Sequence, residues 1–178
     1  MKKMWFCVLL IVCFLLFTPA ARADYVLPYP SYMPGNKVYR ISRIVDQLKK
    51  YWYFGNIAQL KYHLGLSDKY LVEAKTLMEY NQYLLATDAL ARSDKEFLQI
   101  PAYIQAAKKE NVDTADLINM IKEAANKHTE VLSILKDSVP SQFMWTPEKA
   151  RPTELNLKEL LTSSEEIRSK TVADIQSF

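Results

Sequence analysis

The stretch that decides the fold is residues 57–80, which reads IAQLKYHLGLSDKYLVEAKTLMEY. Its apolar residues recur three or four positions apart, as on one face of an α-helix, and not at every second position, as in a strand. Gly65 lies within this helix and weakens it by about 1 kcal/mol relative to alanine. The face includes one serine and consists of Ile57, Leu60, Leu64, Ser67, Leu71, Ala74 and Met78. Because one such helix cannot bury its apolar face alone, we expect it to pack against others.

The residues that follow predict an antiparallel neighbour. Asn81-Gln82 is a short link, and short links join helices that lie side by side. The next helix begins near Tyr83 and runs to about Lys109. We expect a kink or break at residues 98–100, because Pro101 lacks a backbone donor and restricts the residue before it. The apolar face of this helix consists of Tyr83, Thr87, Leu90, Asp94, Phe97 and Ile104.

Residues 113–139 predict a helix of similar length. Asp113 is a candidate N-cap, and Pro140 ends the pattern. Its face consists of Leu117, Ile121, Ala124, His128, Val131 and Leu135. Residues 37–139 therefore predict an all-α domain, an antiparallel bundle of three long helices with an N-terminal amphipathic helix against it. We expect the core to include Leu60, Leu64, Leu71, Leu90, Phe97, Ile121 and Leu135.

The two ends of this domain differ from it in composition. Residues 24–36 form a proline-rich strap, whose tyrosines we expect to lie along the bundle. Residues 140–152 form a proline-containing linker, in which Phe143-Met144-Trp145 either packs as a strap or contacts a partner. Residues 153–178 form a final amphipathic helix, and the sequence leaves open whether it docks on the bundle.

Residues 1–23 are typical of a secretory signal peptide. Lys2 and Lys3 precede an apolar run from Met4 to Phe17, and Ala21-Arg22-Ala23 fits a cleavage site before Asp24. We therefore expect a secreted, periplasmic or cell-surface protein, although an uncleaved leader would act as a tether. The leader also holds both cysteines, so no disulfide is expected in the mature part.

The charge balance excludes a nucleic-acid-binding footprint. The chain has 23 basic and 20 acidic residues, and three of the basic ones, Lys2, Lys3 and Arg22, belong to the leader. The remaining chain is therefore neutral overall, whereas nucleic-acid-binding domains are strongly basic.

Residues 25–98 resemble the bacterial domain-of-unknown-function family 5667, and we expect the resemblance to continue through residue 139. The resemblance lies in a proline-rich strap, an aromatic residue followed by a glycine that ends the first helix, and a long helix after it. The residues concerned are Tyr25 to Pro30, Met33-Pro34-Gly35, Tyr39, Trp52, Phe54-Gly55, His63-Leu64, Leu66, Asp68, Leu71 and Glu73-Ala74. The resemblance implies an extracytoplasmic helical domain and brings no catalytic residue with it.

The sequence contains no motif for catalysis or cofactor binding. G-x-S-x-G, P-loop, G-x-G-x-x-G and H-E-x-x-H patterns are all missing. His63 and His128 are the only histidines, and neither has the glutamate three residues earlier that a di-iron bundle site uses. We interpret His128 as a hydrogen-bonded core residue and His63 as a residue at the flank of its helix. We expect no catalytic residue, no metal and no cofactor.

The one local charge excess lies in residues 37–61, which hold six basic residues and Asp46 as the only acid. A basic amphipathic helix over residues 37–54, ending Tyr51-Trp52-Tyr53-Phe54, is typical of a membrane-surface helix. The favoured alternative is that Trp52 and the stripe from Val38 to Leu48 are core, with the basic residues facing the acidic remainder of the domain. The candidate membrane or partner surface comprises Lys37, Arg40, Arg43, Lys49, Lys50 and Trp52.

Two functional hypotheses follow. The first is a non-enzymatic envelope module that binds an envelope protein partner or organises the cell surface. The second is a peripheral binder of an anionic membrane surface, acting through residues 37–54. An enzyme or a metal-dependent protein ranks third, and the sequence does not indicate an oligomeric state.

Overall fold

The computed structural model describes residues 24–149 and 151–177, so the predicted signal peptide, residues 1–23, lies outside the described residues. The described chain is mostly helical, which confirms the all-α prediction. In chain order its helices are α2 (Lys37–Lys49), the short 3-10 helix η1 (Lys50–Trp52), α3 (Asn56–Glu79), α4 (Tyr83–Phe97), α5 (Ile100–Lys109), α6 (Ala115–Ser138) and α7 (Leu157–Ser177).

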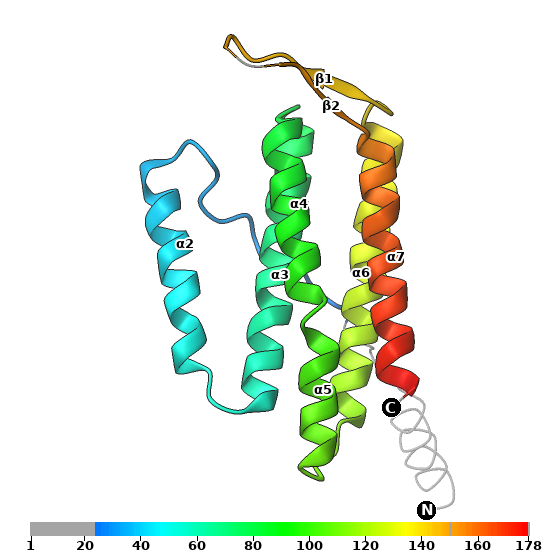
Figure 1. Ribbon diagram of the computed structural model, residues 1–178. Helices are drawn as coiled ribbons and strands as arrows, with labels where there is room; N and C mark the ends of the chain where they lie inside the picture. The colour runs from blue at the N-terminus through cyan, green and yellow to red at the C-terminus, as the bar shows by residue number, and fades with distance from the viewer. Residues whose placement is uncertain (1–23, 150, 178) are drawn as a thin grey trace, which may run out of the picture.

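The helices after η1 pack lengthwise, with α3 antiparallel to α4 and α5, and α6 antiparallel to α7 (Figure 1). α3 packs on α4 and α5, α6 packs on α7, and α3 and α6 also touch. α2 stands at the edge of the molecule, beside α3. None of the described helices is long and apolar enough to cross a membrane.

The break expected near Pro101 is confirmed. α4 ends at Phe97, and α5 begins at Ile100 with Pro101 in its first turn. Proline is tolerated there because the first backbone donors of a helix have no partner within it. The helix predicted over residues 83–109 is therefore two shorter helices that continue in the same direction (Figure 1).

Two asparagines make tight turns in a chain that has three glycines. Asn81 follows α3 and Asn111 follows α5, and both have φ of 58°, a left-handed conformation that asparagine tolerates better than most residues. After α3, the amide of Gln82 donates to the carbonyl of Leu77 over 2.8 Å, which closes a Schellman motif. The same pattern follows α5, so both turns occupy only a few residues.

The expected core is confirmed, because all seven residues named above are buried. The core of the described residues has two large parts and one small cluster, which consists of Tyr62, Leu66 and Tyr70 on α3. One half packs around Leu71, Leu90 and Leu132, and the other packs around Leu64, Phe97 and Ile121. Along α3, α4, α6 and α7, buried or partly buried polar residues separate the two halves. We call them the polar layer; they are Ser67, Asp68, Ser93, Asp94, His128, Ser164 and Arg168.

The C-terminal part contains two strands as well as a helix. β1 (Phe143–Trp145) pairs antiparallel with β2 (Thr153–Leu155), so residues 140–152 are not simply a linker. The helix expected from residue 153 begins at Leu157 instead. It docks on the other helices, because Leu157, Leu161 and Ile175 are fully buried, and this answers the question that the sequence left open.

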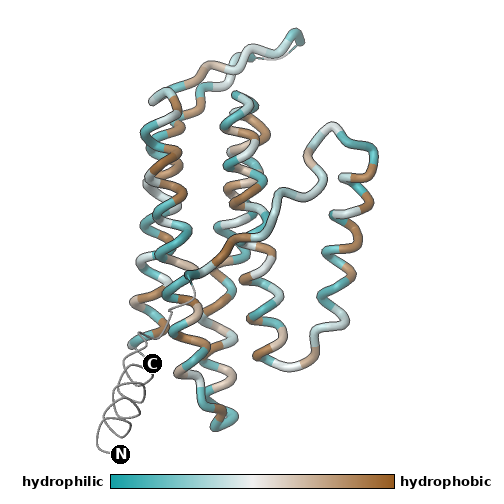
Figure 2. Tube along the Cα trace, turned by 180° about the vertical axis from the view of Figure 1, so that it is seen from behind, coloured by the Kyte–Doolittle hydropathy of each residue, from teal (hydrophilic) through white to brown (hydrophobic). Residues whose placement is uncertain are grey.

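The segment before α2 lies only partly on the helices. It crosses them and then reaches the start of α2 (Figure 2). Tyr25 packs against one half of the core and Leu27 against the other. Tyr29 and Tyr32 are exposed, so the expectation that the tyrosines of this segment lie along the bundle is wrong for these two.

The prediction for residues 37–54 needs two corrections. The α-helix ends at Lys49, and a 3-10 turn and an irregular stretch carry the chain to α3. The interpretation of Trp52 and the Val38 to Leu48 stripe as core is also wrong, since their apolar side chains are exposed. The cause is the way in which α2 docks.

Candidate functional site

α2 docks on α3 through polar side chains. The Tyr39 hydroxyl donates to Oε1 of Glu73 over 2.6 Å, and Arg92 of α4 donates to the same carboxylate over 3.0 Å. Burial, followed by this hydrogen bond, raises the pKa of Tyr39 to about 12, so the hydroxyl stays protonated and donates. Lys69 of α3 pairs with Asp46 of α2.

A second anchor lies near the C-terminal end of α2. The hydroxyl of Tyr62 donates to the backbone carbonyl of Asp46 over 2.8 Å, and the Asp46 side chain also lies 3.5 Å from Lys49. Among the residues of α2, all of which the structure describes, only Asp46 is buried. The polar side of this helix therefore faces inward.

The apolar side of α2 consequently faces solvent. Successive residues of an α-helix are turned by about 100°, which places the apolar residues roughly opposite Tyr39, Ser42 and Asp46. Ile41 is 59% exposed and Trp52 is 71% exposed. We call this surface the outer face; it comprises Val38, Ile41, Ile44, Val45, Leu48 and Trp52. Figure 2 shows hydrophobic segments on α2 although the helix stands at the edge of the molecule.

The predicted surface residues surround the outer face. Lys37, Arg40, Lys49 and Lys50 are exposed, whereas Arg43 is half-buried with its guanidinium 5.9 Å from the Tyr39 ring. By the same helical geometry, Arg40 and Lys49 border the apolar row on its two sides. The only acidic residue of this segment, Asp46, is turned inward and paired. The structure thus brings the other predicted basic residues together around an exposed apolar row, whereas Arg43 lies on the docking side.

A cleft of about 490 Å³ opens between α2 and α4. Ile44 and Leu48 line one wall, and His63 and Glu96 lie on the other. The Nδ1 atom of His63 is 2.6 Å from Oε2 of Glu96, and its ring stacks on Tyr103 with centroids 5.1 Å apart. The interpretation of His63 as a flank residue is therefore wrong, because the ring is buried and hydrogen-bonded.

His128 lies in the polar layer, as a hydrogen-bonded core histidine. Its Nε2 atom is 2.7 Å from Asp68, and the hydroxyl of Tyr25 donates to the other oxygen of that carboxylate over 2.6 Å. Burial lowers the pKa of His128, and Arg168 lowers it further, although the hydrogen bond to Asp68 opposes the shift. At pH 7 the ring is therefore neutral and donates from Nε2.

The other half of the polar layer surrounds a guanidinium. Arg168 is 0% exposed; it pairs with Asp94 and donates to the hydroxyl of Ser93 over 2.8 Å. Ser164 donates to the second oxygen of Asp94 over 2.7 Å. Burial lowers the pKa of Arg168, while its pairing with Asp94 acts in the opposite direction.

The chemistry available to these groups is limited by their mutual contacts. The Ser67 and Ser93 hydroxyls hydrogen-bond to each other and to backbone carbonyls, and not to His128. His63 and His128 bind different carboxylates, Glu96 and Asp68. Within residues 24–149 and 151–177, no three histidine, cysteine or carboxylate side chains gather in a way that could hold a metal ion.

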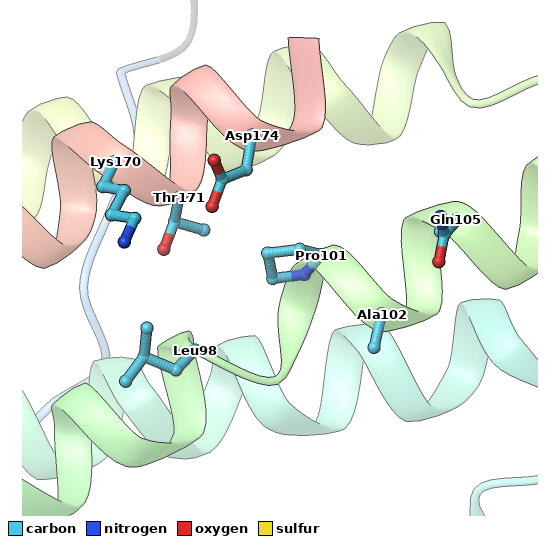
Figure 3. A pocket seen from close by; sticks show the side chains of 7 residues that line it. All are labelled: Leu98, Pro101, Ala102, Gln105, Lys170, Thr171 and Asp174. Carbon is cyan, nitrogen blue, oxygen red and sulfur yellow. The ribbon is translucent and has the colours of Figure 1, made fainter. Parts of the chain in front are cut away.

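A further cleft, of about 400 Å³, lies where α4 ends and α5 begins (Figure 3). Leu98, Pro101 and Ala102 line one side, and Lys170 and Asp174 of α7 line the other. Figure 3 shows Lys170 and Asp174 on the same helix, with Thr171 between them. The cleft borders the break before Pro101 and combines an apolar wall with one cation and one carboxylate.

Sequence reasoning missed the polar layer, although a signal was present. Ser67, Asp94 and His128 each interrupt an otherwise mostly apolar helix face. Ser67 and His128 lie near the middle of α3 and α6, and Asp94 lies near the middle of the helix predicted over residues 83–109, so side-by-side packing brings the three to the same height. No such signal pointed to Arg168, because the sequence left undecided whether its helix packs on the others.

Comparison with known proteins identifies a family that the chain matches. The family described as domain of unknown function (DUF5667) matches residues 31–142. This range begins after Tyr25 and ends before β1, so the segments that carry Tyr25, Ser164 and Arg168 lie outside it. No curated protein and no solved structure matches the chain. Because the match covers more than half of its residues, the chain belongs to the DUF5667 family.

Proposed function

We propose that the protein is a non-enzymatic, exported interaction module that binds its partner through the outer face of α2. The observation that carries this proposal is the inverted docking of α2, with its polar side against α3 and its apolar side in water. Contiguous exposed apolar surface is uncommon on monomeric proteins and marks interaction sites.

The proposed fold of this module is an antiparallel helical bundle, with the proline-rich segment as a strap. The side-by-side helices and the two-part core support this interpretation. In it, α3 and α4 form a rigid base, and the Glu73 and Asp46 contacts hold α2 in a fixed orientation on that base.

The non-enzymatic part of the proposal rests on how the reactive groups are placed. His128 is fully buried behind Asp68 and Tyr25, and the serine hydroxyls of the polar layer already bond to one another. These contacts support a structural role for the layer.

Site-specific photo-crosslinking in cells tests the binding surface. A benzophenone amino acid replaces Leu48 or Ile41 on the outer face, or Ile134 as the matched control. Ile134 is an apolar residue of α6 that is 57% exposed. We expect the same adduct from positions 48 and 41 and none from position 134. Equal labelling at all three positions, or at none, would contradict the proposal.

Export is tested separately from binding. The proposal predicts that the protein is recovered outside the cytoplasm with Asp24 as its first residue, which mass spectrometry of the intact chain would identify. Recovery in the cytoplasm with the N-terminal methionine intact would contradict export.

A further inference from the structure

We infer that the partner of the outer face is an anionic membrane surface, on which α2 lies with its axis parallel to the lipid plane. This inference rests on the proposed function, because it names the partner of the same surface. Three features of the described residues support it: the charges around the outer face, the aromatic residues at its end, and the orientation of this face away from α3.

The charges around the outer face are of one sign. Lys37, Arg40, Lys49 and Lys50 are exposed at its ends and sides. Asp46 is removed from this surface by its pairing with Lys69. An apolar row enclosed by basic side chains is complementary to lipid, whose acyl chains accept the row and whose anionic headgroups accept the bases.

Aromatic residues extend the apolar row beyond the end of α2. Tyr51, Trp52 and Phe54 are largely exposed, and Phe54 is 81% exposed. Tryptophan and tyrosine favour the membrane interface, because one part of the ring system is apolar and the other carries a polar group. η1 and the irregular stretch after it thus provide an aromatic anchor next to Lys49 and Lys50.

The outer face is also oriented so that a flat partner can reach it. α2 stands at the edge of the molecule, and the residues that dock it are on the opposite side of the helix (Figure 1). A planar surface can therefore approach α2 along its length. It meets the row on the side of Val38, Ile41 and Val45, because Ile44 and Leu48 also border the cleft next to His63.

A second copy of the chain fits this surface less well. A two-fold contact between outer faces would place Arg40 and Lys49 of each copy against the same basic residues of the other. Like charges brought together at an interface are repulsive, whereas an anionic lipid surface neutralises them. An envelope protein with an acidic rim remains as an outcome of the test.

Vesicle sedimentation tests the inference with the protein as its cells process it. The vesicles are phosphatidylcholine alone, or an equimolar mixture of phosphatidylcholine and phosphatidylglycerol. Every variant is prepared in the same processed form, so that any contribution of the leader is the same throughout. We expect binding to the mixed vesicles, weaker binding to the neutral ones, and loss of binding as salt rises and screens the charges.

Charge variants give the expected size of the effect. Each basic residue near an anionic surface contributes about fivefold to partitioning, so Lys49→Gln with Lys50→Gln lowers it by about 30-fold. Lys158→Gln with Lys170→Gln is the matched control, since both lysines are exposed on α7. We expect the control to bind as the unaltered protein does.

Tryptophan fluorescence tests whether the outer face itself enters the membrane interface. Emission shifts to shorter wavelength when an indole enters the membrane interface. We expect this shift on adding mixed vesicles, its loss in Trp52→Phe, and its retention in Trp145→Phe. Circular dichroism and urea unfolding of each variant confirm that the fold is unchanged.

The outcomes separate the inference from the proposed function. Equal binding to both vesicle types, or binding that Lys49→Gln with Lys50→Gln leaves unchanged, overturns the inference. If positions 41 and 48 crosslink one protein while no vesicle binds, the proposed function stands and the lipid partner is wrong. If neither crosslinking nor vesicle binding occurs, both fail.

Discussion

Arg168 is a fully buried guanidinium, and its burial carries a large energetic cost. Removing two charges from water costs several kcal/mol per ion, and their mutual attraction offsets this only when the geometry is good and other hydrogen bonds are made. Arg168 meets that requirement with Asp94, the Ser93 hydroxyl and the face of Phe97, whose ring lies 5.2 Å away. The pair therefore depends on both partners.

We expect Arg168→Met to lower the free energy of unfolding by about 3–5 kcal/mol, because it leaves the Asp94 carboxylate without its cation. Urea unfolding followed by circular dichroism measures the loss. Lys170→Met, on the exposed side of the same helix, should change it by less than about 0.5 kcal/mol. Adding Asp94→Leu to Arg168→Met should recover most of the loss, and no recovery would show that the charge pair is not the cause.

His128 should make the stability depend on pH. Burial lowers its pKa in the folded state, so below about pH 6.5 the unfolded chain binds a proton that the folded chain does not. As the pH is lowered below that value, the free energy of unfolding therefore decreases by up to about 1.4 kcal/mol per pH unit, until the pH reaches the lowered pKa of the folded state.

Urea unfolding at pH 7.5 and at lower pH measures this dependence. His128→Gln should make the curve shallower below pH 6.5, whereas His63→Gln leaves the His128 contribution in place. The same curve for unaltered protein and His128→Gln would rule out His128 as the source.

At the scale of elements, polar contacts hold α2, while apolar packing holds α3, α4, α6 and α7. Because the Tyr39 hydroxyl donates to a buried carboxylate, we expect Tyr39→Phe to weaken the docking of α2 by about 2 kcal/mol. Amide exchange in α2 should then become about 30-fold faster, with exchange in α3 unchanged.

Tyr80→Phe is the matched control for that change, because Tyr80 is a tyrosine of the same region that is largely exposed. It should leave exchange in α2 as it is. If Tyr39→Phe also has no effect, the Glu73 contact does not fix α2.

The elements themselves could be predicted because their signals are local. Periodicity located the helices, Pro101 located the break, and Leu64, Phe97 and Ile121 were recognised as core. The direction of α2 could not be predicted in this way. A hydrophobic pattern defines two sides of a helix, but only tertiary contacts such as Asp46 with Lys69 decide which side faces inward.

The strands and the polar layer could not be predicted from the sequence for a related reason. β1 and β2 are three residues each, which is too short to give a distinct strand pattern in the sequence. The partners in the polar layer are far apart in sequence, as Ser93 and Arg168 are. Spacing along one helix gives no information about such contacts.

At the scale of the whole molecule, the family match ends before a helix that the core requires. α7 contributes Leu157, Leu161 and Ile175, all fully buried. Burying side chains of this kind contributes roughly 1.5–3 kcal/mol each, so their loss is comparable to the total stability of a typical domain, about 5–15 kcal/mol.

We therefore expect a chain that ends at residue 142 to lose cooperative unfolding, which near-ultraviolet circular dichroism during a urea titration would show. Adding a separate peptide of residues 143–178 should restore part of the signal. A cooperative transition in the shortened chain alone would mean that the family region folds without α7.

The sequence separation of 74 residues between Asp94 and Arg168 also sets the order of events during synthesis. A polypeptide leaves the ribosome N-terminus first, so Asp94 emerges well before its cation, and α7 is still enclosed when the other helices are free. The polar layer is thus completed only after residue 168 has left the ribosome. Until then the nascent chain stays incompletely folded, and an incompletely folded chain is the substrate that the export proposed above would require.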